Sequence, residues 1–341
     1  MLSAAATRPV ERAELPEARG PISAHVLALL RRPGVEPGPA GTVDAGIIRA
    51  ADPYGEDLQL ALYCCYELHY QGFAGVDDER EWDLEILGVR RELERRFLAA
   101  LRSDATPGAD LATEVEGLLV ESPDAEGVSH HLRRDGELWQ LREYIAHRSI
   151  YHLKEADPQA WVIPRLSGPA KTVLVGLEYD EYGAGRPDRM HARLFGDMML
   201  ELGLSDRYGA YLDVAPAPTL AEVNFMSLCG LHRALRGALV GQFAVVELTS
   251  SPGSERLVRA MRRLGCGPAA IEFYDEHVEA DAVHEQMIRL GVLGPLLAAE
   301  PELERDVVFG IRASLMLGDR LGEFLLSRWA DGLTTLRGPL S

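Results

Sequence analysis

The chain has 341 residues, of which 53 are Asp or Glu and 35 are Lys or Arg, so its formal net charge at pH 7 is −18. A nucleic-acid-binding protein needs clustered Lys and Arg to neutralise phosphates, and an anionic membrane surface would repel so acidic a chain. We therefore expect neither nucleic acid nor a membrane as a partner. The length suits one large domain or two smaller ones.

Localisation is expected to be cytoplasmic. The first residues, MLSAAATRPVERAELPEARG, lack the apolar core of ~7–15 residues that a signal peptide needs. Nowhere does the chain reach the ~18 consecutive apolar residues of a membrane span. The four cysteines form no Cys-x-x-Cys pair, and we expect them to be buried free thiols, as is usual in a reducing compartment.

The first third of the chain reads as an arm followed by helices. Residues 1–20 are rich in Pro, Glu and Arg and predict a flexible arm. An N-terminal helical region, 21–105, follows, and it offers a surface for dimerisation. Within it, 58–73 and 81–103 keep apolar residues at i, i+3, i+4 and i+7, the period of an amphipathic helix. Ser, Asp, Gly and Pro gather at 103–110 and predict a linker.

A second, larger region at 110–335 is also helical. Alternating period-2 runs are nearly absent from it, so the chain is expected to be all-α, with helices that bury one stripe against each other in a bundle. The predicted helices are 138–156, 170–182, 187–204 (with Pro187 at its first position), 220–248, 254–265, 268–291 and 302–332.

One motif on these helices suggests metal binding. His277, Asp281 and His284 form an H-x3-D-x2-H pattern. At ~100° per residue, Asp281 lies about 40° and His284 about 20° from His277, so the three share one helical face. Two imidazoles and a carboxylate suit a divalent first-row metal such as iron. The competing interpretation is an acidic, solvent-facing helix with two incidental histidines.

Further ligands would come from facing helices, as in other helical-bundle metal sites. Two segments upstream of this helix contain several acidic residues and histidines that could serve as ligands. One offers Glu178, Asp180, Glu181, Asp188 and His191, and the helix before it offers Glu143, His147, His152, Glu155 and Asp157.

The order of these residues resembles that of the heme-oxygenase-like diiron oxidases and oxygenases, also described as iron-containing redox enzymes. A Glu in one helix, a Glu and a His around the next helix, and H-x3-D-x2-H near the end carry the resemblance, which covers roughly residues 110–330. It implies a heme-oxygenase-like helical bundle, two Fe(II) ions as cofactor and O2 as co-substrate. The ligands that it implies are Glu155, Glu181, His191, His277, Asp281 and His284, with Glu143 as the alternative to Glu155.

Charge counting agrees with this chemistry. Three carboxylates would balance three of the four positive charges of two Fe(II) ions, so the site would carry about +1 and keep positions open for O2 and substrate. The resemblance further implies a weakly held second iron, a peroxo-diiron(III) intermediate and a homodimer. An external electron donor is a further possible partner.

Several functions are compatible with these residues. N-oxygenation of an amino acid or other amine-containing small molecule is favoured by the resemblance to N-oxygenating members of the family. The same site could instead support oxidative C–C cleavage, decarboxylation or desaturation of an amino acid or fatty acid. A heme-binding protein or a non-enzymatic helical protein would also be compatible with an all-α chain. Arg148, Arg165 and Arg186 flank the ligand helices, and one of them could bind a substrate carboxylate, although ordinary ion pairing is the simpler expectation.

Overall fold

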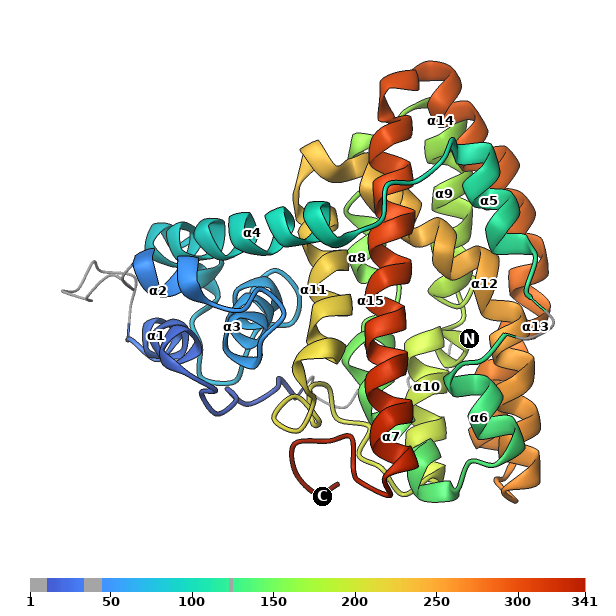
Figure 1. Cartoon of the computed structure of the whole chain (residues 1–341), viewed down its shortest axis with the longest axis horizontal. Helices are drawn as coiled ribbons and strands as arrows, with labels where there is room; N and C mark the ends of the chain where they lie inside the picture. Colours follow the sequence, from blue (N-terminus) through green and yellow to red (C-terminus); the bar gives the residue numbers. More distant parts are fainter. Residues whose placement is uncertain (1–10, 34–44, 123–124, 341) are drawn as a thin grey trace, which may run out of the picture.

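The computed structural model describes residues 11–33, 45–122 and 125–340, apart from the side chains of 45 and 279–282. The described residues are mainly helical and contain no β-strand, only one isolated bridge between Ala13 and Phe73. This confirms the predicted all-α class. In Figure 1 a small group of N-terminal helices lies beside a taller bundle. None of the described helices has the length and apolar character that crossing a bilayer requires.

The small N-terminal group is held together partly by a helix cap supplied from another helix. Asp57 accepts hydrogen bonds from the backbone N–H groups of Ile22 and Ser23, at 2.9 and 2.7 Å, and so satisfies donors that a helix leaves free at its start. The group consists of α1 (Pro21–Leu30), α2 (Ala45–Ala50), α3 (Glu56–Glu67) and α4 (Leu84–Asp104).

The segment before α1 differs from the predicted flexible arm. Residues 1–10 lie outside the described part of the chain, but residues 11–20 pack on the fold. Arg19 forms an ion pair with Glu56 at 2.7 Å, and its Nη2 donates to the carbonyl oxygen of Leu212, also at 2.7 Å. These partners are distant in sequence, so local composition gave no sign of them.

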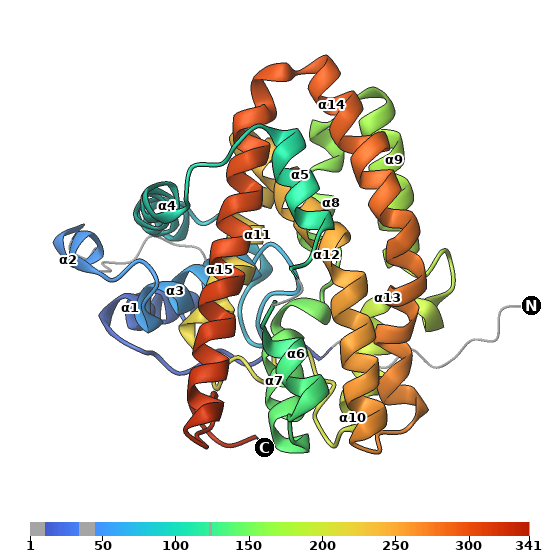
Figure 2. The ribbon, with the colours of Figure 1, turned by 45° about the vertical axis from the view of Figure 1, so that its right-hand side comes forward.

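The taller bundle is built around α12, which packs along both α13 and α15 (Figure 2). Two glycines allow α12 and α15 to approach closely. A Cβ on Gly241 would lie 2.0 Å from the carbonyl oxygen of Val307, and one on Gly310 would lie 2.1 Å from that of Ala238. The bundle comprises α5 (Leu111–Leu119), α6 (Val128–Arg134), α7 (Leu138–His152), α8 (Asp157–Ala160), α9 (Gly168–Glu181), α10 (His191–Glu201), α11 (Ala217–Leu231), α12 (Arg236–Arg263), α13 (Pro268–Gln286), α14 (Gly294–Ala299) and α15 (Glu304–Ala330).

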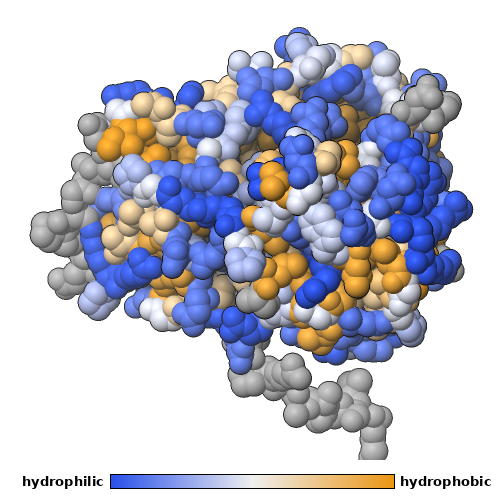
Figure 3. Space-filling view, turned by 60° about the horizontal axis from the view of Figure 1, so that its bottom comes forward, coloured by the Kyte–Doolittle hydropathy of each residue, from blue (hydrophilic) through white to orange (hydrophobic). Residues whose placement is uncertain are grey.

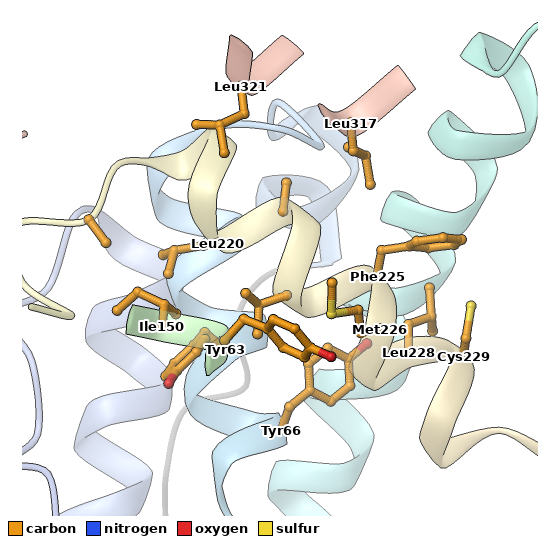
Figure 4. Packing of buried hydrophobic residues seen from close by; sticks show 14 of the residues in the cluster. Tyr63, Tyr66, Ile150, Leu220, Phe225, Met226, Leu228, Cys229, Leu317 and Leu321 are labelled. Atoms are coloured by element: carbon orange, nitrogen blue, oxygen red, sulfur yellow. The ribbon is translucent and has the colours of Figure 1, made fainter. Parts of the chain in front are cut away.

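One buried cluster joins the two groups of helices. Figure 4 shows α11 between α3 and α15, with Phe225 and Met226 of α11 near Tyr63 of α3 and Leu317 of α15. Each such side chain contributes about 1.5–3 kcal/mol when it is fully buried. The N-terminal helices therefore share their core with the bundle. On the outside, the face drawn in Figure 3 is largely polar with small, separated apolar patches.

The predicted single helix over 220–248 is wrong. The structure ends α11 at Leu231, and His232 is extended (φ −105°, ψ 112°) before α12 begins at Arg236. The cause is a side chain from elsewhere in the chain. The guanidinium of Arg165 donates to the carbonyl oxygens of Gly230 and Leu231, the latter at 3.0 Å, and so satisfies acceptors at the helix end.

Two helix starts and stops also differ from the prediction. The break expected between 248 and 254 is absent, because α12 runs through Pro252 with buried residues on both sides. A proline normally interrupts a helix by removing a donor and crowding the preceding turn. Here the packing of the buried residues on both sides of Pro252 keeps the helix continuous. Pro187 opens a short 3₁₀ turn, 187–189, and α10 begins only at His191.

The end of the helix that carries the H-x3-D-x2-H motif is not a regular α-helix. After α13 the chain forms a π-helical stretch, Met287–Leu293, and then continues into α14. Such stretches are rare and occur frequently at functional sites. Here the stretch packs on α9, and Gly291 allows the approach, since a Cβ there would lie 2.7 Å from Val173.

Candidate metal centre

Four of the six predicted ligands lie together. Glu155, Glu181, His191 and His277 are all buried, and one ligand atom from each lies within 4.8 Å of the others. They come from four different places: the turn after α7, the last residue of α9, the first residue of α10 and the middle of α13. Helix ends therefore position half of this group.

A second group adjoins the first. Glu181, Glu247 and His284 are also buried, with ligand atoms within 4.8 Å of one another. Glu181 belongs to both groups. A small cavity of about 10 Å³ is lined by Glu155, Glu181, Glu247 and His277 among others, which is room for about one water-sized sphere.

Sequence reasoning missed Glu247, whereas it named Asp281 as a ligand, and that assignment stays a prediction. Glu247 lies in the apolar run of α12, GALVGQFAVVEL, which pointed to a core helix. A carboxylate that interrupts such a run is itself a signal, because ionised groups are rarely buried without a partner. The side chain of Asp281 lies outside the described residues, and α13 places its backbone between those of His277 and His284.

The two ring nitrogens of His277 have distinct roles. Nδ1 donates to the carbonyl oxygen of Phe273 at 2.7 Å, which leaves Nε2 without a proton in the neutral ring. Nε2 lies on the side of Glu155, 3.8 Å from its Oε1. A histidine whose second nitrogen is held by a carbonyl in this way is oriented as a metal ligand.

His191 and Glu181 approach each other as two ligands of one cation would. The Nδ1 of His191 lies 2.7 Å from Oε2 of Glu181, yet this buried nitrogen makes no hydrogen bond with the described residues. The close pair therefore lacks the alignment of a donor and an acceptor. A cation placed between the groups would engage both atoms.

His152 holds Glu155 in place from outside the group. Its Nδ1 donates to Oε1 of Glu155 at 2.7 Å, and its Nε2 accepts from Nε of Arg148 at 3.4 Å. The ring also stacks on Phe195 with 4.8 Å between centroids. The other oxygen of Glu155, Oε2, is buried and has no hydrogen-bond partner among the described residues, so it is available to a cation.

Burial and mutual repulsion shape the electrostatics of the site. Burial raises the pKa of Glu247, and burial together with the charges of Glu181 and Glu247 raises the pKa of Glu178 to about 9. Burial would also raise the pKa of Glu155, but the charge of His152 and its hydrogen bond to the carboxylate hold that pKa well below the usual range. Buried carboxylates so close together are costly unless a cation balances them.

Two further candidates from the sequence, Glu143 and His147, lie elsewhere. Glu143, the alternative to Glu155, accepts hydrogen bonds from Nε1 of Trp329 at 3.1 Å and from the backbone N–H of Thr335 at 2.9 Å. His147 contacts the hydroxyls of Thr219 and Thr335. Neither residue belongs to a ligand group, and both instead fasten the C-terminal segment to α7.

A larger cavity leads to the first group. Its volume is about 750 Å³, and its lining includes His152, Glu155 and His277. Residues of α11, α12, α13 and α15 form much of its wall. A space of this size accommodates a small organic molecule beside the ligand atoms.

The donor set fits iron. Carboxylates and imidazoles without thiolates suit divalent first-row metals, and the two groups share one carboxylate. The sequence profile of the iron-containing redox enzymes matches residues 142–319, a stretch that includes every residue of both groups. The chain therefore belongs to this family of heme-oxygenase-like, all-α oxidoreductases, as the sequence predicted.

The chain also resembles one enzyme that is named for its activity. The chain is similar to the nitrosourea synthase of Streptomyces achromogenes subsp. streptozoticus, with 24% identity over 278 residues. The matched part is 79% of this chain and 54% of the relative, so the chain spans about half the length of that enzyme.

Proposed function

We propose that the chain is a non-heme diiron oxidoreductase that uses O2 to oxygenate a nitrogen of an amino acid or other amine-containing small molecule. The observation that carries the diiron assignment is the sharing of Glu181 by two buried groups of ligand atoms. A carboxylate with an oxygen in each group can hold two ions side by side. Two ions near each other are what a diiron oxidoreductase requires.

In this proposal each group holds one iron. Glu155, Glu181, His191 and His277 would hold the first ion, and Glu181, Glu247 and His284 would hold the second. Asp281 remains the sequence-based candidate for the second ion. The carboxylates would then number four: Glu155, Glu181, Glu247 and Asp281. They would balance the four charges of two Fe(II) ions, so the expected charge of the site becomes about zero instead of +1. The bound irons would supply electrons for the reduction of O2.

The protein residues around the ligands orient them and limit water. His152 fixes Oε1 of Glu155, and the carbonyl of Phe273 fixes the ring of His277. The rings of Phe195 and Phe273 contact His152 face-on and edge-on, at 4.8 and 5.1 Å. A substrate in the large cavity would reach the first group past this aromatic wall.

Support for nitrogen as the oxidised atom comes from the relative's name alone, so the reaction itself has to be tested. Anaerobic titration with Fe(II) should give up to two irons per chain, and later exposure to O2 should give a transient visible absorption. Aerobic incubation with an amino-acid library, followed by mass spectrometry, should show an added oxygen on nitrogen. A lost carbon fragment or a new double bond would instead establish carbon-centred oxidation by the same site. A protein that binds no iron, or that shows the Soret band of bound heme, would refute the proposal.

A further inference from the structure

An ion pair lies on the wall of the large cavity. Nη1 of Arg148, on α7, is 3.0 Å from Oε2 of Glu222, on α11, and the two side chains are only 24% and 16% exposed. Both residues line the cavity, alongside the apolar side chains of Phe225 and Met226.

The pair leaves one donor group and one acceptor unused. Arg148 donates through Nε to His152 and through Nη1 to Glu222, and the described residues offer no hydrogen-bond partner to its Nη2. Glu222 uses Oε2, while its Oε1 lies 3.6 Å from the point where a Cβ on Gly318 would be. Neither atom is among the fully buried polar atoms that lack a partner, so both keep accessible surface, and both residues line the cavity.

Stability alone does not account for this pair. Replacing a buried ion pair with apolar residues of similar volume is often neutral or stabilising, because desolvation of the two charges offsets their attraction. Here the surrounding wall already contains such apolar residues. A positive and a negative group side by side with free hydrogen-bonding atoms are complementary to a ligand that carries both charges on neighbouring atoms.

We propose that Arg148 and Glu222 bind the zwitterionic end of an α-amino acid, with Arg148 donating to its α-carboxylate and Glu222 accepting from its α-ammonium group. This rests on the proposed function and narrows its substrate class. The pair sits close to the candidate metal centre: one imidazole ring, that of His152, separates Arg148 from Glu155, with contacts of 3.4 and 2.7 Å. The amino-acid side chain would then extend along the cavity towards Glu155 and His277.

The same pair would reject the competing substrates. A fatty acid would bring its carboxylate beside that of Glu222, and like charges at a partly buried site repel strongly. An amine without a carboxylate would leave Arg148 with an unused donor. Charge selection of this kind works by penalising the wrong ligand as well as by binding the right one.

Binding measured without iron and without O2 tests this inference separately from the redox chemistry. Isothermal titration of the metal-free 341-residue chain with the twenty L-amino acids should identify at least one ligand. The matching amine without the carboxylate and the matching acid without the amino group should each bind about 10- to 100-fold more weakly, the range expected for hydrogen bonds between charged groups.

Variants assign the effect to the pair. Arg148→Met should weaken amino-acid binding by a similar factor, and Glu222→Gln should weaken it while strengthening binding of the matching deaminated acid, which a purely structural role would not do. Arg256→Met is the matched control: Arg256 also lines the cavity, but it is bonded to Glu121 and Ser129, so binding should persist. Gly318→Val, which adds bulk beside Oε1 of Glu222, tests the same subsite if Arg148→Met does not fold.

The proposal is overturned if no amino acid binds, if Glu222→Gln leaves the preference between amino acid and acid unchanged, or if Arg256→Met loses as much binding as Arg148→Met. If the chain binds an amino acid but takes up no iron, only the proposed redox function is refuted, and the binding proposal stands.

Discussion

Nζ of Lys154 lies 2.8 Å from Oε2 of Glu67, and both side chains are almost completely buried. Tyr208 donates its hydroxyl to the same carboxylate, and the ring of Tyr70 lies 4.3 Å from the ammonium. Glu67 ends α3, whereas Lys154 directly precedes the ligand candidate Glu155. The N-terminal helices thus fasten the turn that presents one side of the candidate metal centre.

Breaking this pair should destabilise the whole chain. Glu67→Leu leaves the ammonium of Lys154 buried without its counter-charge, which costs about 3–5 kcal/mol in the free energy of unfolding. Urea denaturation of the metal-free protein measures this loss. The double variant Glu67→Leu with Lys154→Met should recover most of it, because no charge is then stranded. If the double variant is less stable than either single one, the pair is not what holds the turn.

Iron stoichiometry should separate the two ligand groups. Glu247→Ala removes a residue of the second group only, so anaerobically loaded protein should retain about one iron per chain. Glu181→Ala removes the shared carboxylate and should lower retention of both. Iron analysis after desalting measures this. Asp275→Ala, on the exposed side of α13, is the control and should retain as much iron as the unmodified chain. Equal retention in all three variants would contradict the assignment.

Loss of His284 should abolish iron-dependent chemistry without unfolding the chain. His284→Ala removes an imidazole that lies 3.1 Å from Glu247 and 3.7 Å from Glu181. O2 consumption by the Fe(II)-loaded protein should disappear, while the helical circular dichroism stays unchanged because Ala270, Phe273 and Tyr274 also anchor α13 in the core. Normal O2 consumption in this variant would mean that the second group is not part of the site.

His152 should affect iron affinity although it belongs to neither ligand group. His152→Phe keeps a ring to stack on Phe195 but removes the hydrogen bond to Glu155. Loss of such an outer partner typically lowers metal affinity about 10–100-fold. Competition with a chromophoric chelator measures that affinity. An unchanged affinity in a folded variant would show that Glu155 needs no support from this ring.

The sequence predicted those parts of the site that depend on local spacing. His277 and His284 share a face because both belong to one helix, and the all-α class follows from a period repeated along the chain. The sequence left Glu143 and Glu155 as alternatives, and only the tertiary structure shows that Glu143 is engaged by residues about 190 positions away. Glu247 was missed because an apolar run normally indicates a core helix, and only the fold brings His284 beside it.

The ends of the helices also depend on contacts that the local sequence does not predict. Arg165 binds the end of α11 from 65 residues away, and the local sequence does not reveal this contact. Packing carries α12 through Pro252, where local rules predict a stop. Long-range contacts therefore decided the boundaries, whereas periodicity decided the presence of the helices.

His147 should make the stability of the chain depend on pH. Burial lowers its pKa to about 4, and its two ring nitrogens lie 2.7 and 2.8 Å from the hydroxyls of Thr219 and Thr335. In the unfolded chain the pKa is about 6.5. As the pH falls from about 6.5 to 4, His147 therefore becomes protonated in the unfolded state while it stays neutral in the folded state. The contribution of neutral His147 to the free energy of unfolding, about 3 kcal/mol, is fully present above pH 6.5 and is lost as the pH falls to about 4.

The variant His147→Gln isolates this contribution, because glutamine offers a donor and an acceptor to the same hydroxyls but does not titrate. Urea denaturation of both metal-free proteins at several pH values between 7 and 4 gives the difference in their free energies of unfolding. All other titrating groups cancel in that difference, so the native chain should lose about 3 kcal/mol relative to the variant as the pH falls. Parallel pH profiles would show that His147 is charged in the folded chain or that its pKa is close to that of the unfolded state.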